Sequence, residues 1–149
     1  MEPLLGFPFV VVNWYGNAQK KSEGVYDAGL KNGDWTHWSS DGQLLGTNQW
    51  SQGNGLISSW IEPGRVRSKG EYKNGKQNGK WTFWWYDESI ESARSEGEFK
   101  EGERSGQWVT WLMNGPVRQK TVRWEQGECI KITCLNAENE PVECSDECG

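Results

Sequence analysis

A recurring frame of one aromatic residue, two glycines and two tryptophans constrains the fold of this chain more than any other feature. In each full copy the aromatic is followed by Gly at +3, Gly at +7, Trp at +9 and Trp at +12. The starting aromatics stand at positions 26, 50, 72, 99 and 124, and this period indicates a stack of similar supersecondary units. The copies cover residues 26–46, 50–66 (shortened between its glycines), 70–95, 97–119 and, as a half-copy, 122–128.

Each copy predicts a β-hairpin. A short strand carries the aromatic, a loop bounded by the two glycines follows, and a longer strand such as 80–86 or 107–113 returns. Asn-Gly pairs at 32–33, 74–75 and 78–79 accept the positive φ that tight hairpin turns require. Connections this short make neighbouring strands antiparallel.

The predicted fold class is therefore all-β. We expect an elongated, single-layer, twisted antiparallel meander of tandem hairpins over residues 1–128, with little or no helix, and a cysteine-bearing acidic tail or cap over 129–149. The apolar opening, residues 1–12, is interpreted as a first strand because it lacks the basic start and cleavage site of a signal peptide, although a leader could have been removed. Residues 87–95 replace the short return of the other copies and are expected to form a surface excursion.

The alternation of side chains along a strand predicts aromatic rows on both faces of the sheet. Trp81, Phe83 and Trp85 would share one face, and Trp84 and Tyr86 the other. A bulge would instead bring both rows to one face. We interpret the tryptophans first as structural residues, because repeat stacking alone requires them.

Charge and hydropathy exclude several classes of partner. The chain has 16 basic and 21 acidic residues, a net charge of -5, and five of the acids lie in residues 136–149. The rest of the chain is thus neutral, which disfavours nucleic acid and anionic membrane surfaces as partners. We interpret the acidic end as solvated rather than as an interaction tail. A mean hydropathy of -0.85, without an apolar stretch of about 20 residues, predicts no integral membrane segment.

The sequence contains no recognisable catalytic set. Its one histidine, His37, lies between tryptophans on a predicted strand, without a Ser or Cys partner nearby in sequence. The glycines have hairpin spacing rather than the spacing of phosphate-binding loops. We predict that the protein is not an enzyme, and we expect no cofactor and no metal.

Four cysteines cluster in the last 21 residues: Cys129, Cys134, Cys144 and Cys148. Two disulfides with one of three pairings, a structural zinc site, and four reduced thiols are the alternatives. Two bridges would cap the end of the sheet and indicate a periplasmic or extracellular location, whereas reduced cysteines would indicate the cytoplasm. The sequence leaves this open.

From Tyr26 to about Gly127 the chain resembles the MORN repeat, and residues 72–81 resemble the variant MORN repeat of bacterial antitoxin proteins most closely. That unit reads Tyr-x-Asn-Gly-Lys-x-x-Gly-x-Trp, and this segment reads YKNGKQNGKW. The resemblance implies an antiparallel hairpin sheet and, because many bacterial members are antitoxin or immunity components, a toxin partner. The shortened second copy, the insertion at 87–95 and the cysteine tail depart from the family pattern.

Three functions follow as hypotheses. The first is an immunity or antitoxin protein that binds and neutralises a cognate bacterial toxin; the second is an envelope-associated scaffold that self-assembles through sheet edges or faces. The third is a carbohydrate-binding module, because rows of tryptophan can stack on sugar rings. Protein-binding surfaces favour Trp, Tyr and Arg. The candidate partner-binding residues are Trp84, Tyr86, Asp87, Glu88, Glu91, Arg94 and Trp111.

Overall fold

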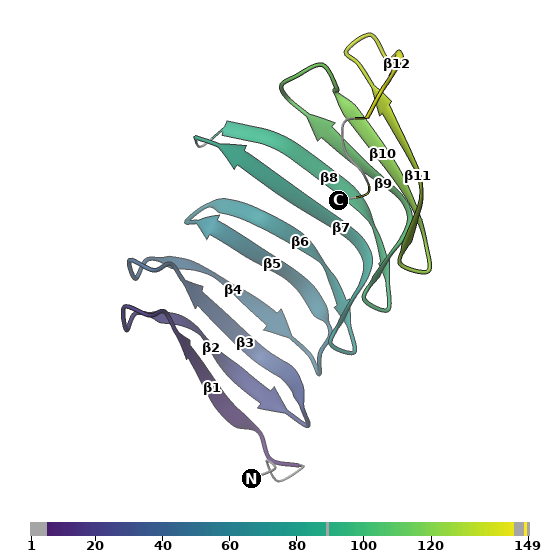
Figure 1. Ribbon diagram of the computed structural model, residues 1–149. Helices are drawn as coiled ribbons and strands as arrows, with labels where there is room; N and C mark the ends of the chain where they lie inside the picture. The colour runs from purple at the N-terminus through teal and green to yellow at the C-terminus, as the bar shows by residue number, and fades with distance from the viewer. Residues whose placement is uncertain (1–5, 89, 145–147, 149) are drawn as a thin grey trace. The chain divides into compact units, whose positions relative to one another are not determined.

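The computed structural model describes residues 6–88, 90–144 and 148. Over these residues the chain forms twelve strands and no helix, which confirms the predicted all-β meander of hairpins. Strands β1 to β4 form one open antiparallel sheet in chain order, and the strands from β5 onward belong to a second (Figure 1). The chain divides into two compact units, Met1–Lys76 and Gln77–Gly149. The strands are β1 Phe9–Trp14, β2 Lys20–Asp27, β3 Leu30–Trp38, β4 Leu44–Trp50, β5 Gly55–Glu62, β6 Arg65–Lys73, β7 Lys76–Asp87, β8 Ile90–Lys100, β9 Glu103–Leu112, β10 Gln119–Glu125, β11 Glu128–Leu135 and β12 Pro141–Val142.

Each repeat turns at the glycine at +3, through two residues with positive φ. In the first repeat these are Ala28 (φ 48°) and Gly29 (φ 79°), and β3 begins at the next residue. Two successive positive φ values define the type I′ turn, whose twist matches that of the flanking strands. The predicted loop between the two glycines is therefore wrong, since a two-residue turn replaces it. The same turn recurs at 52–53, 74–75, 101–102 and 126–127.

The glycine at +7 lies inside a strand and not in a turn, contrary to the prediction for Asn32-Gly33 and Asn78-Gly79. Gly33 (φ 72°) is in β3, and the register of the β2–β3 ladder breaks between Glu23 and Val25. Gly106 (φ 67°) is in β9, where the β8–β9 ladder breaks in the same way. An extra residue with positive φ is the geometry of a β-bulge, so this glycine adjusts strand twist and register.

The tryptophan at +9 packs on a glycine of the neighbouring strand. Trp35 and Trp108 are each 2 % exposed. A Cβ on Gly24 would lie 2.2 Å from the Trp35 ring, and one on Gly97 would lie 2.2 Å from the Trp108 ring. The two indole N–H groups donate to backbone carbonyls of that neighbouring strand, at 3.0 Å and 3.1 Å. The repeat therefore buries this tryptophan by placing a glycine, which has no side chain, on the neighbouring strand beneath the ring.

In the first unit, a side chain joins the two sheets. Next to the isolated backbone bridge Ser51–Asn54, the Asn48 side-chain amide forms hydrogen bonds with both the N–H and the C=O of Ser58 on β5. Trp35, Trp50 and Ile57 form the buried cluster of this unit, with partly buried Val11, Tyr26 and Tyr72 packed against it.

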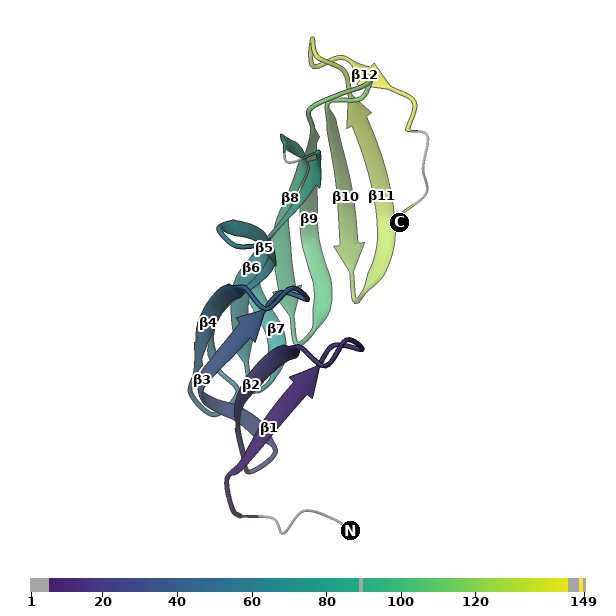
Figure 2. The same cartoon turned by 90° about the vertical axis from the view of Figure 1, so that its left-hand side faces the viewer.

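Successive turns are also hydrogen-bonded to one another. The Gly53 N–H donates to Lys31 O at 2.8 Å, and the Gly75 N–H donates to Gly53 O at 2.9 Å. In the second unit the Gly102 N–H donates to Gln77 O at 2.8 Å. Within each unit, these bonds link neighbouring hairpins near their turns. Figure 2 shows strands β8 to β11 of the second unit side by side.

Three segments differ from their predictions or fall partly outside the described residues. Residues 87–95 are not an excursion, because β7 and β8 pair up to Asp87–Ile90; Ser89 lies outside the described residues. Cys129 and Cys134 lie on β11, a full strand paired with β10, rather than in a tail. Residues 1–5 of the predicted first strand, and 145–147 and 149 of the acidic end, lie outside the described residues; β1 itself covers Phe9–Trp14.

Candidate interaction surfaces

Three of the predicted partner-binding residues form one row across three strands of the second unit. Trp84 on β7 is the register partner of Arg94 on β8, and Arg94 is the partner of Trp111 on β9. Side chains directly opposite one another in an antiparallel ladder point to the same face, so the three lie together. The Arg94 guanidinium lies 5.0 Å from the centre of the Trp111 ring, a cation–π contact. All three side chains are partly exposed.

The other four predicted residues lie at the end of the same hairpin. Tyr86 pairs with Glu91, and Asp87 and Glu88 are exposed at the turn, where Glu88 has a φ of 43°. The structure thus brings an aromatic and cationic row next to three carboxylates, which the sequence order alone did not show. We call the seven residues the β7–β9 surface: Trp84, Tyr86, Asp87, Glu88, Glu91, Arg94 and Trp111.

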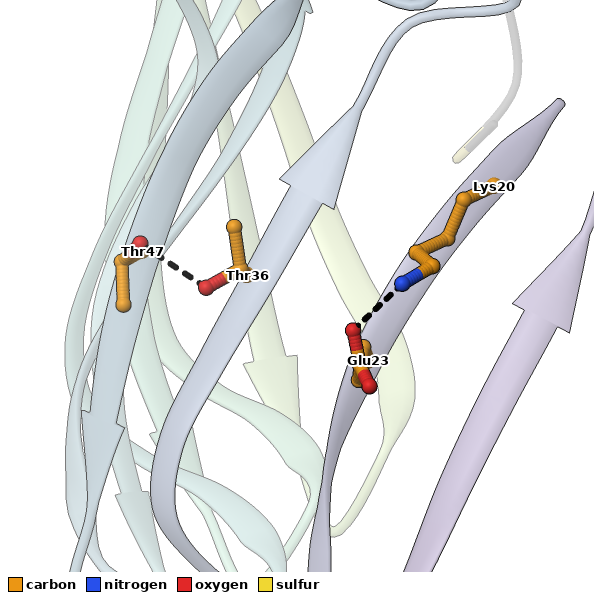
Figure 3. A network of polar contacts seen from close by, with 4 residues as sticks. All are labelled: Lys20, Glu23, Thr36 and Thr47. Atoms are coloured by element: carbon orange, nitrogen blue, oxygen red, sulfur yellow. Dashed lines mark hydrogen bonds and ion pairs between the residues drawn. The ribbon is translucent and has the colours of Figure 1, made fainter.

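The row is held by an ion pair that has a counterpart in the first unit. Arg94 Nε lies 3.3 Å from Glu96 Oε1. In the first unit Lys20 Nζ lies 2.7 Å from Glu23 Oε2 and 5.3 Å from the centre of the Trp38 ring. Figure 3 shows this pair along β2, next to the hydroxyl contact of 3.1 Å between Thr36 and Thr47 on β3 and β4. In each unit, the tryptophan at +12 is covered by a cation that forms an ion pair with a glutamate.

The opposite face of the second unit is hollowed, and sequence reasoning did not identify it as a site. A hollow of about 360 Å³ is lined by residues of β7 to β10 and by Cys148. Trp85, 46 % exposed, stands at this hollow, and Trp108 and Trp124 line it with Arg104. Strand parity correctly placed Trp81, Phe83 and Trp85 on one face, since their rings follow one another with centroids 5.7 Å and 6.5 Å apart.

A cation lies between two tryptophans at the same repeat position in each unit. Lys31 Nζ is 4.4 Å from the Trp35 ring centre and 5.3 Å from that of Trp50. The Arg104 guanidinium is 4.7 Å and 5.3 Å from the ring centres of Trp108 and Trp124. Burial lowers the pKa of Lys31 and that of Arg104, because an apolar surrounding disfavours the charged form.

The same two-tryptophan arrangement leaves polar atoms buried. Among the described residues, the indole Nε1 atoms of Trp50 and Trp124 are buried and have no hydrogen-bond partner. Both tryptophans occupy the starting-aromatic position of their repeats, which other copies fill with Tyr or Phe. A signal for this site existed in the sequence: a basic residue stands five positions after Tyr26 and five positions after Phe99, the starting aromatics of the preceding copies.

His37 contacts side chains of neighbouring strands. Its Nε2 lies 3.4 Å from Asn48 Nδ2, and its ring lies 5.7 Å from that of Trp60. Burial lowers the pKa of His37, and the positive charge of Lys31 lowers it further.

All four cysteines are paired, which confirms the disulfide alternative and contradicts the zinc and free-thiol alternatives. The bonds are Cys129–Cys148 and Cys134–Cys144. β12 pairs with β11 only at Cys134 and Leu135, so it covers part of that strand's edge. Among the described residues, no group of three or more His, Cys, Asp or Glu side chains could hold a metal ion.

Within the described part of the chain, no helix is long and apolar enough to cross a membrane. No protein-family model matches the sequence and no curated protein matches it, so the resemblance to variant MORN repeats stays a prediction from the motif.

Proposed function

We propose that the protein is a protein-binding repeat module that acts as an immunity or antitoxin protein, binding and neutralising a cognate bacterial toxin. The observation that supports this best is the β7–β9 surface. It combines two partly exposed tryptophans, a tyrosine and an arginine with three carboxylates on one hairpin and its neighbouring strand. Trp, Tyr and Arg are the residues that contribute most to protein interfaces.

Contacts within the surface favour affinity. Its tryptophans stand on paired strands, and Arg94 contacts Glu96 and the Trp111 ring. Side chains that are ordered before binding lose less conformational entropy on association. The mixture of a hydrophobic row and acidic residues at its end favours a partner with basic groups around an apolar contact.

The two disulfides extend the proposal to a compartment. Disulfides form and persist in oxidising environments. We therefore place this immunity role outside the cytoplasm, where the toxin partner would be secreted or surface-exposed.

The test is co-expression of the full chain with each neighbouring gene of its genome, followed by affinity purification and growth measurement. We expect one toxic neighbour to be captured and its toxicity to be suppressed. Trp84→Ala and Trp111→Ala should weaken capture by at least about tenfold each, the loss typical of interface hot spots. Trp85→Ala is the matched control, because Trp85 lies on the opposite face of the same strand and should bind normally. Capture of no toxic protein, without any protection of growth, would contradict the proposal.

Self-assembly is a second candidate, supported by β1. This strand has the uncharged sequence FVVVNW, it pairs with β2 on one side, and Val10 and Trp14 are 64 % and 59 % exposed. An apolar edge strand is a template for pairing with another chain. Light scattering of the purified chain distinguishes the two: a dimer or larger assembly that Val10→Lys dissociates supports self-assembly, whereas a monomer opposes it.

A further inference from the structure

A second hollow, in the first unit, has the chemistry of a site for a negatively charged group. It has a volume of about 360 Å³ and lies where the stacked turns meet the strands. Its polar side chains are all hydrogen-bond donors or can act as donors, and no Asp or Glu lines it. These side chains are Lys31, Lys76, Tyr26, Asn74 and Trp50.

The two ammonium groups of this hollow lack the ion pair that Lys20 and Arg94 have. Lys20 and Arg94 each have a glutamate partner. Lys31 and Lys76 form no ion pair with any described residue. Two carboxylates lie close to Lys31 in sequence: Asp34 is exposed, and Asp27 accepts a hydrogen bond from Gln52 Nε2 at 2.7 Å. In the described part of the chain, two positive charges therefore line the hollow with no carboxylate among the lining residues.

The Trp50 indole supplies an independent observation. Trp50 is 7 % exposed, lines the hollow, and has an Nε1–H without an acceptor among the described residues. A buried donor without a partner costs free energy. Trp35, at the neighbouring repeat position, avoids this cost by donating to Val25 O. A group bound in the hollow beside Trp50 would supply the acceptor that this N–H lacks.

The available donors favour a carboxylate over a phosphate. Phosphate sites in proteins typically use several free backbone N–H groups. Here the N–H groups of Gly53 and Gly75 are already engaged in the hydrogen bonds between turns. The remaining donors are two ammonium groups, a phenol and side-chain N–H groups, which suit the two oxygens of a carboxylate.

We propose that this hollow binds a carboxylate group, held by the Lys31 and Lys76 ammonium groups and by the Trp50 indole N–H. The group could belong to a small acid or to a Glu or Asp side chain of another protein. The proposal is independent of the immunity function, because its residues lie in the first unit and the β7–β9 surface lies in the second.

The experiment titrates the full chain with three probes: glutarate, the peptide acetyl-Glu-Glu-Glu-amide and inorganic phosphate. Calorimetry measures affinity, and the Trp50 indole N–H signal in a ¹⁵N–¹H spectrum, assigned with Trp50→Phe, reports the site. We expect a carboxylate probe to bind and to shift that signal. Lys31→Met should weaken binding by at least about tenfold, since it removes one charge but keeps the apolar stem. Lys73→Met, an exposed lysine of β6 that does not line the hollow, should bind like the wild type.

The probes also identify the source of the carboxylate. Binding of glutarate alone assigns the site to a small acid, and tighter binding of the peptide assigns it to a protein side chain. Unchanged affinity in Lys31→Met would overturn the proposal if a thermal melt shows that the variant is folded. Equal binding of the all-glutamine peptide, tighter binding of phosphate than of glutarate, or no carboxylate binding at millimolar concentration would overturn it as well.

Discussion

The side-chain amide of Asn48 pairs with the backbone of Ser58 as a peptide group of a neighbouring strand would. Its Nδ2 lies 2.9 Å from Ser58 O, and its Oδ1 lies 2.9 Å from Ser58 N. Asn48 is 5 % exposed and stands on β4, while Ser58 stands on β5. One side chain therefore joins β4 and β5, which belong to different sheets.

Asn48→Ala should lower the free energy of unfolding by about 2–3 kcal/mol, because it leaves both the N–H and the C=O of Ser58 without these partners in a partly buried place. Chemical denaturation measures the change. Asn17→Ala is the control: its amide donates to Ser40 O at 2.7 Å on an exposed turn, so the loss should be about 1 kcal/mol or less. Equal losses of unfolding free energy in the two variants would show that the Asn48 hydrogen bonds stabilise the fold no more than an exposed one does.

Gly97→Ala should destabilise the second unit by about 3 kcal/mol, and Gly24→Ala the first unit by a similar amount. In both cases the added methyl group would lie 2.2 Å from a buried tryptophan ring, which cannot move without disturbing the core. Thermal unfolding and near-ultraviolet circular dichroism measure the effect. Gly16→Ala meets no atom within 4 Å and should change stability by about 0.5 kcal/mol at most. A normal melting temperature for Gly97→Ala would refute this packing.

Stability should fall as the pH is lowered through the region below about 6.5, the ordinary pKa of histidine. In the folded protein burial lowers the pKa of His37, with a further contribution from Lys31. The unfolded chain therefore takes up a proton at a pH at which the folded chain does not, and this favours unfolding. The loss ends once the pH is below the folded pKa as well. Denaturation curves at a series of pH values should show this slope, and His37→Gln should flatten it.

The intact chain should be lighter than the reduced chain by the mass of about four protons, two for each disulfide. Mass spectrometry under non-reducing conditions checks this. Replacing Cys134 and Cys144 by serine should cost about 2–4 kcal/mol, since the bond restricts the unfolded chain. Four free thiols in the untreated protein would disprove both bonds.

Much of the fold could be predicted because the repeat contains its own turn and strand chemistry. The glycine at +3 takes a positive φ, which residues other than glycine rarely accept, so hairpins and their antiparallel order follow from local sequence. The residue before it also has a positive φ, but it is Ala, Gln or Glu in four of the five turns and gave no such signal. The role of the glycine at +7 could not be read in this way. Gly33 and Gly106 satisfy a bulge that exists only when two strands pair, and a single strand carries no sign of it.

The candidate sites, like the fold, could be predicted from the sequence only in part. Trp84, Arg94 and Trp111 were chosen for residue type, but their common row depends on ladder register, which joins positions ten and seventeen residues apart. The Lys31 hollow was missed because its residues come from the turns of three repeats. Sequence spacing indicates which residues repeat, and it does not indicate which donors lack a partner.

The amino-acid sequence by itself determined that this protein is a series of antiparallel hairpins, because positive-φ turns and alternating aromatic residues act over a few neighbouring positions. The tertiary structure decided which cysteines pair, where Asn48 joins the sheets, and which lysines face a hollow without an anion. These properties depend on contacts between residues far apart in the chain, and burial, which sets their energies, exists only once the strands have assembled.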